Sequence, residues 1–160
     1  MAFESEQKFL KITEKSIDIE KELIVPEGKT KESIVKTRVN QSFFRKMILS
    51  SYDSRCCITG LPLKELLIAS HIIPWAQDSK NRLNPQNGLC LNSLHDKAFD
   101  QGFITIDTSY QVVISSEVKK LSPNNVKIIT DYQGVQMVMP CRFMPKQEFL
   151  DYHRKNIFRT

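Results

Sequence analysis

The sequence has no C-x-x-C pair and no long apolar run. Its four cysteines include the neighbours Cys56 and Cys57, a pattern that suits neither a disulfide framework nor a zinc ribbon, so reduced thiols are expected. No apolar stretch approaches the roughly 20 residues that cross a bilayer. The acidic start has neither the basic nor the apolar segment of a secretory signal. A cytoplasmic protein that does not enter membranes is therefore expected.

Internal repeats and low-complexity tracts are also missing. The 160 residues, 41% hydrophobic and 26% charged, suit one compact globular domain. Residues 1–28 carry four lysines and seven acidic residues, whereas residues 29–160 carry 19 basic and 11 acidic ones. We predict an acidic arm or helix at 1–28 and one domain at 29–160. Its basic charge favours a polyanionic partner such as nucleic acid, although a merely basic surface is an alternative.

The periodicity predicts a mixed α+β fold. Apolar residues recur at helical spacing in several segments, and alternating or short apolar runs bounded by turn residues predict two hairpins and a further strand pair. The expected helices cover 4–22, 30–52, a short stretch after Asn92 or Ser93, and a segment opened by Pro145. The expected strands cover 65–73 with 89–91, 103–107 with 111–115, and a pair within 125–139 around Gln133-Gly134.

The stretch 68–100 holds two of the three histidines, the only tryptophan and an Asn-Gly pair. Phosphodiester cleavage requires a base, a cation that stabilises developing charge, and basic residues that hold the strand. His71 at the end of one strand and His95 at the start of a helix can face each other. The Asn87 amide can bond the loop that carries His71 and so fix the imidazole.

Each of these residues also has an ordinary interpretation. A histidine beside an apolar strand, such as His71, is often a satisfied buried side chain, and Asn87 before Gly88 suits a turn. His95 can simply occupy a helix surface. These alternatives stay open on the residue types alone.

Three motifs in order resemble the HNH endonuclease family, and more closely its bacterial restriction-endonuclease-like branch. They are ASHIIPW (69–75), NRLNPQNGLCL (81–91) and LHDKAFDQGFIT (94–105), and the likeness extends over most of 28–158. The resemblance implies a ββα-metal core, flanked here by the terminal helices and additional hairpins. It also implies double-stranded DNA as substrate, His71 as general base, Asn87 as the residue that holds its loop, and His95 as a metal ligand.

The sequence departs from the family pattern at two places. Many members carry an acidic residue or histidine before the base, whereas this chain has Ser70, which we assign with His95 as the metal site. Asp78 and Asp100 are open alternatives, and Asp96 is disfavoured because it lies about 100° around the helix from His95. Many members also carry C-x-x-C knuckles, which are missing here, so no structural zinc is expected.

The sequence thus predicts a metal-dependent DNA endonuclease of restriction or defence. One divalent ion is expected, Mg²⁺ first, with Mn²⁺, Ni²⁺ or Zn²⁺ as alternatives. Phosphate contacts are expected from Lys80, Arg82 and Lys97, and a homodimer is expected because cutting both strands often requires two centres. The alternatives are a DNA-binding module with a decayed HNH centre and an interaction protein with a basic surface.

Overall fold

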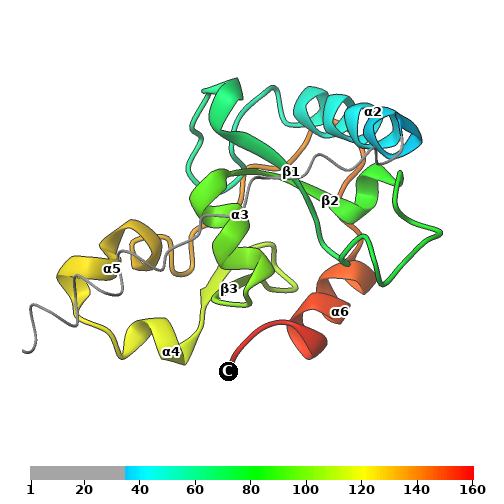
Figure 1. Cartoon of the computed structure of the whole chain (residues 1–160). Helices are drawn as coiled ribbons and strands as arrows, with labels where there is room; N and C mark the ends of the chain where they lie inside the picture. Colours follow the sequence, from blue (N-terminus) through cyan, green and yellow to red (C-terminus); the bar gives the residue numbers. More distant parts are fainter. Residues whose placement is uncertain (1–34) are drawn as a thin grey trace, which may run out of the picture. The chain divides into compact units, whose positions relative to one another are not determined.

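A computed structural model describes residues 35–160, with side chains from residue 40 onward. It confirms a mixed α+β fold (Figure 1). The helices are α2 (Val35–Ser51), α3 (Ser93–Asp100), α4 (Ser116–Lys119), α5 (Pro123–Thr130) and α6 (Gln147–Asn156), with short 3-10 helices η1 (Lys64–Leu66) and η2 (Pro85–Asn87). The strands are β1 (Leu67–His71), β2 (Gly88–Asn92), β3 (Ile104–Ile106) and β4 (Val112–Ile114). The predicted helix at 4–22 and arm at 1–28 lie outside the described residues.

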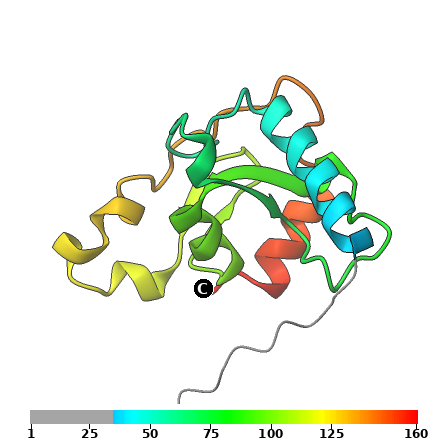
Figure 2. The ribbon, with the colours of Figure 1, turned by 45° about the horizontal axis from the view of Figure 1, so that its top comes forward.

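The centre of the fold is the antiparallel hairpin of β1 and β2. Its register runs from Leu67 opposite Asn92 to His71 opposite Gly88. α3 follows β2 directly and packs against both strands, while α2 also contacts both (Figure 2). The strand ends at His71, as predicted from Pro74, which cannot donate a ladder hydrogen bond. Two strands and a following helix thus form the expected ββα unit. No helix within 35–160 is long and apolar enough to cross a membrane.

Gly88 is not the turn residue that the Asn-Gly pair predicts. It opens β2 in an extended conformation with φ −142°, so the turn interpretation is wrong although the hairpin with a long loop is confirmed. A Cβ at Gly88 would lie 2.5 Å from Ile48 Cδ1 and 2.7 Å from Phe44 Cζ. Glycine suits this position because the side chains of α2 pack directly against the backbone of β2, and a larger residue would displace them.

Local signals set the ends of α3. The Asn92 side chain accepts a hydrogen bond from the His95 amide at 2.9 Å, which makes Asn92 the N-cap and decides between the two predicted caps. Gly102 follows the helix with φ +73°, in the left-handed region that favours glycine. The helix therefore begins and ends where the sequence predicts.

The strand pair predicted within 125–139 is wrong. Pro123 opens α5 there, and strand pairing is reduced to a single bridge between Gln111 and Gln136. Val126 and Ile129 lie three residues apart and pack on the core, a helical spacing that favours α5 over a strand. The β3–β4 hairpin, in contrast, forms as predicted, with Ile104 opposite Ile114.

The third histidine, His153, joins α6 to the rest of the core. Its Nε2 donates to the Phe99 carbonyl at 3.0 Å, so Nδ1 accepts from the Thr105 hydroxyl at 2.9 Å. Burial lowers the pKa of His153 to about 4. α6 starts at Gln147, two residues after Pro145, and contacts β3 as the predicted packing of this helix requires. His153 is therefore a neutral, fully bonded core residue.

Gly102 and Gly134 form a matched pair for a stability measurement. Their φ angles are +73° and +75°, but a Cβ would meet open space at Gly134 and the Ile157 carbonyl oxygen at Gly102. We expect Gly134→Ala to cost about 1 kcal/mol from backbone strain alone. We expect Gly102→Ala to cost about 3 kcal/mol or more, because the chain end must also move. Urea unfolding measures both values, and equal losses would contradict the tight contact.

Candidate active site

His71 is half-buried between two aromatic side chains. Its ring stacks on Phe44 with centroids 3.9 Å apart and meets Trp75 edge-on at 5.4 Å. His71 Nε2 lies 2.9 Å from the Arg82 carbonyl oxygen. A carbonyl can only accept, so Nε2 carries the hydrogen and Nδ1 keeps a free lone pair. Burial lowers the pKa of His71, against the raising effect of the Arg82 bond, so the ring is neutral at pH 7.

Asn87 is buried and holds the loop that follows His71. Its amide oxygen accepts from the Ile73 N–H at 2.8 Å, and its amide nitrogen donates to the Ile73 carbonyl at 3.2 Å and the Asn81 carbonyl at 3.4 Å. This is the contact that the sequence predicts for Asn87. Its consequence for cleavage stays a prediction.

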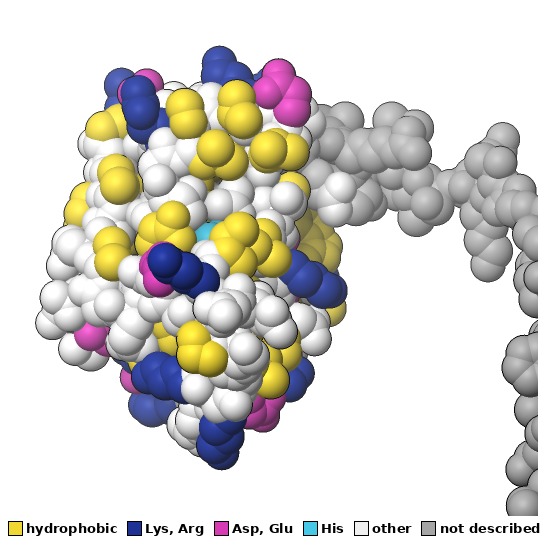
Figure 3. Space-filling model, turned by 90° about the vertical axis from the view of Figure 1, so that its left-hand side faces the viewer, with side chains coloured by type: hydrophobic (Ala, Val, Ile, Leu, Met, Phe, Trp, Pro, Cys, Tyr) yellow, Lys and Arg dark blue, Asp and Glu magenta, His cyan; other side chains and the backbone are white. Residues whose placement is uncertain are grey.

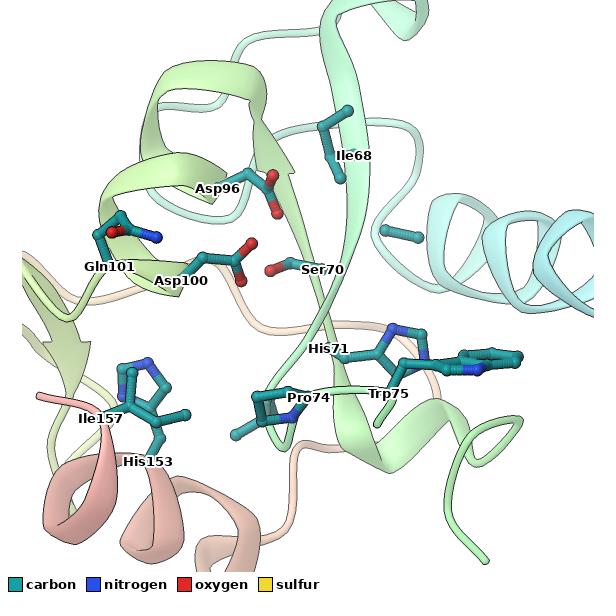
Figure 4. A pocket seen from close by; sticks show the side chains of 12 residues that line it. Ile68, Ser70, His71, Pro74, Trp75, Asp96, Asp100, Gln101, His153 and Ile157 are labelled. Carbon is teal, nitrogen blue, oxygen red and sulfur yellow. The ribbon is translucent and has the colours of Figure 1, made fainter. Parts of the chain in front are cut away.

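Ser70, Asp96 and Asp100 bring their oxygens together on the α3 side of β1 (Figure 4). The two carboxylates are four residues apart and so lie on one face of the helix. Burial raises the pKa of both, and the charge of Asp96 raises that of Asp100 further. The Ser70 hydroxyl offsets part of the rise at Asp96, although it makes no well-formed hydrogen bond within the described residues. The group therefore concentrates oxygen ligands and negative charge.

A cavity of about 420 Å³ connects these oxygens with His71. Successive residues of a strand point to opposite faces, so Ser70 points toward α3 and His71 toward Phe44. Both nevertheless line the cavity, because β1 ends there. Within residues 35–160, no three histidine, cysteine or acidic side chains already form a metal-binding cluster.

His95 does not reach this cavity. It is 1% exposed, and it lies after Asn92, which pairs with Leu67 at the opposite end of β1 from His71. It lines a different pocket. The expectation that His71 and His95 face each other is therefore wrong, and Ser70 is not brought together with His95.

The acidic pair is the feature that the sequence analysis missed. The sequence alone disfavours Asp96 as a ligand, because it lies about 100° around the helix from His95. That rotation directs Asp96 toward Ser70, because His95 points into another part of the protein. The sequence feature that could have identified this pair is the four-residue spacing of Asp96 and Asp100. On the short helix after the second strand, this spacing places both carboxylates on one face.

The remaining predicted residues have separate surroundings. Asp78 accepts hydrogen bonds from the amides of Lys80 and Asn81 and from the Asn81 side chain, so it stabilises its own loop and is no metal ligand here. Arg82 Nε donates to the Trp75 carbonyl at 2.8 Å, and its guanidinium lies 5.2 Å from the Trp75 ring centroid. Lys80 and Lys97 are exposed, as phosphate contacts require.

Comparisons with known proteins give one family match and a similar solved structure. Residues 56–107 match the family model described as HNH endonuclease. A solved structure titled "Modification dependent TagI restriction endonuclease" is similar, with a TM-score of 0.46 and 18% sequence identity over 70% of this chain. The chain spans only 36% of that protein. The comparison with curated proteins finds no match.

The matched segment begins before β1 and ends after β3, so it contains the β1–β2 hairpin and α3. It therefore includes Ser70, His71, Asp96 and Asp100, which line the cavity. This region is therefore similar in sequence to HNH endonucleases. HNH nucleases generally use a divalent metal ion.

Proposed function

We propose that this protein is a metal-dependent endonuclease of double-stranded DNA, in which His71 activates water for attack on phosphorus. The observation that carries the proposal is the shared cavity, in which a neutral histidine with a free Nδ1 and a pair of carboxylates meet. General-base catalysis needs a neutral imidazole with an accessible lone pair.

The metal assignment moves from His95 and Ser70 to Asp96, Asp100 and Ser70. These side chains offer oxygen ligands, which Mg²⁺ and Mn²⁺ prefer, whereas Ni²⁺ and Zn²⁺ favour imidazole. A cation also offsets the repulsion that raises the pKa of Asp100. A bound ion would supply Lewis-acid stabilisation of the charge that develops on the scissile phosphate.

The protein's own groups account for the handling of the proton. His71 Nδ1 accepts a proton from water as the water oxygen bonds to phosphorus and the bond from phosphorus to the leaving sugar oxygen breaks. The leaving oxygen departs as a hydroxyl after it takes a proton from solvent. The hydrogen bond from Nε2 to the Arg82 carbonyl stabilises the resulting imidazolium and keeps the ring oriented. Asn87 fixes the next turn of the chain through Ile73, which limits the movement of His71.

Plasmid nicking tests the proposal directly. Purified protein is incubated with supercoiled plasmid and Mg²⁺, Mn²⁺ or Ni²⁺, and with a chelator as control. Metal-dependent nicking is expected, with Mg²⁺ or Mn²⁺ more effective than Ni²⁺. DNA binding that falls with salt, without nicking under any metal, would instead support a module with a decayed centre.

The proposal also covers where the enzyme acts and in how many copies. We place the enzyme in the cytoplasm, in restriction or defence, on the resemblance of its motifs to restriction-endonuclease-like members. Two copies acting together would cut both strands, and sedimentation on a duplex fragment tests that arrangement.

Substitutions distinguish the two ligand assignments. We expect Asp96→Asn and Asp100→Asn each to weaken Mn²⁺ binding at least about ten-fold, since each removes a charged ligand from the cation. Calorimetric titration without DNA measures this independently of activity. Asp78→Asn is the matched control, because Asp78 binds only its own loop. If His95→Gln weakened Mn²⁺ binding and the two aspartate variants did not, the original assignment would be right.

A further inference from the structure

A second pocket, of about 550 Å³, shares no lining residue with the cavity that joins His71 to Ser70, Asp96 and Asp100. It is formed by the Thr59–Pro62 loop, Leu66, the start of α3 and part of α5. Its walls are mainly apolar, from Leu61, Pro62, Leu66, Leu94, Ile128 and Tyr132. Figure 3 shows hydrophobic side chains surrounding a small exposed area of histidine on this face.

Thr59, Asn92, Ser93 and His95 supply the polar side chains of this pocket, and the tautomer of His95 follows from its hydrogen bonds. The Asn92 Oδ1 atom accepts from the His95 backbone N–H at 2.9 Å, which fixes the orientation of the Asn92 amide. The same oxygen lies 3.0 Å from His95 Nδ1, so Nδ1 must carry the hydrogen. In a neutral imidazole one ring nitrogen donates and the other accepts. Nε2 is then a hydrogen-bond acceptor.

This acceptor has no partner among the described residues. Nε2 is a buried atom without a hydrogen bond, and the ring edge meets Tyr132, another lining residue, at 5.1 Å between centroids. A buried polar atom left unpaired costs about 1–3 kcal/mol, so the pocket favours an occupant that donates one hydrogen bond.

Three of the apolar lining residues are also unusually exposed. Leu66, Leu94 and Ile128 are 47%, 42% and 61% exposed. An apolar patch around a hollow of this size is typical of a binding site, because covering it removes apolar surface from water. The occupant should therefore be flat or compact and apolar apart from its donor.

We propose that this pocket binds an aromatic ring with a single N–H or O–H donor, the chemistry that indole and phenol share. The ring packs among Leu66, Leu94 and Ile128, and its donor bonds His95 Nε2. A nucleobase fits less well, because its several polar edges would lose water against apolar walls. This proposal does not rest on the nuclease mechanism.

Two sources could supply such a ring, a free small molecule or a tryptophan or tyrosine side chain of another protein. The chain's own first 34 residues contain neither residue type, so they cannot supply it. A side chain carries flanking amides, and N-acetyltryptophanamide therefore serves as the probe for that source, while indole itself serves for the other.

Nitrogen-15 NMR of the histidine side chains tests the site in chelator, where no cleavage takes place. We expect Nε2 of His95 to be unprotonated in the free protein and to shift upfield on titration with indole. Affinity should fall about ten-fold for 1-methylindole, which has lost its donor. Ile128→Lys should weaken indole binding to a similar degree, whereas Leu121→Lys, on an exposed residue outside the pocket, should change it less than two-fold.

The relative affinities of the probes identify the source of the ring and test the proposal. Binding of N-acetyltryptophanamide at least as tight as that of indole assigns the site to a partner side chain, and weaker binding assigns it to a free ring. Equal binding of indole and 1-methylindole, tighter binding of adenosine or cytidine, or no shift of Nε2 would each overturn the proposal, the last because a bound water then satisfies His95.

Discussion

Replacement of His71 by alanine is expected to lower the rate of plasmid nicking by about 10²- to 10⁴-fold, the range that a general base contributes. The variant should bind DNA with an affinity close to that of the unchanged protein, because His71 is not a phosphate-holding cation. Initial rates at saturating metal, with a binding assay in chelator, measure the two effects separately.

The structure supplies a sharper companion variant, His71→Gln. A glutamine amide can still donate to the Arg82 carbonyl, so it keeps the contact of Nε2 while losing the basic Nδ1. It should be as inactive as the alanine variant but more stable. Free imidazole should restore part of the activity of His71→Ala, since the missing ring leaves space between Phe44 and Trp75. A variant that cuts at the original rate would refute the assignment of His71.

Asn87→Ala is expected to lower both stability and cleavage. The substitution leaves the buried Ile73 N–H and carbonyl without partners, which costs about 3 kcal/mol in unfolding free energy. The loop after His71 then loses its anchor, so kcat should fall while DNA affinity is kept. Urea unfolding and single-turnover cleavage below the unfolding temperature measure these effects.

Asn84→Ala is the matched control for Asn87. Asn84 also bonds the loop through its side chain, to the Gln86 amide at 3.0 Å and the Asn81 side chain at 2.9 Å, but it is only partly buried. Its loss should cost less than about 1 kcal/mol and leave kcat almost unchanged. If the two variants lowered kcat equally, Asn87 would have no special part in positioning His71.

The sequence predicted those parts of the site that depend on neighbouring residues. Pro74 limits β1, and Asn92 caps α3. The hydrogen bond between Asn87 and the loop after His71 was predictable, because Asn87 carries a side-chain amide at the start of the second strand, beside that loop. These features need little knowledge of the remaining fold.

The parts that were missed depend on how α3 rotates against the hairpin. Periodicity says that His95 and Asp96 point in different directions, but not which of the two faces Ser70. Packing decides this, because His95 is buried beside Tyr132. The neighbouring Asp96 side chain then points toward Ser70 on β1. In the same way, only the approach of α2 explains why Gly88 is glycine.

The position of Gly88 ties the assembly of the catalytic centre to the pairing of the strands. A slip of β2 by one residue would place the side chain of Asn87 or Leu89 under Phe44 and Ile48, whose side chains even a methyl group would displace. A slip of β1 by one residue would exchange the faces of Ser70 and His71 and so separate the base from its side of the cavity. The register that packs under α2 is thus also the one that keeps the proposed base and metal ligands at one cavity, and on the proposed mechanism a mispaired chain would leave the surrounding DNA intact.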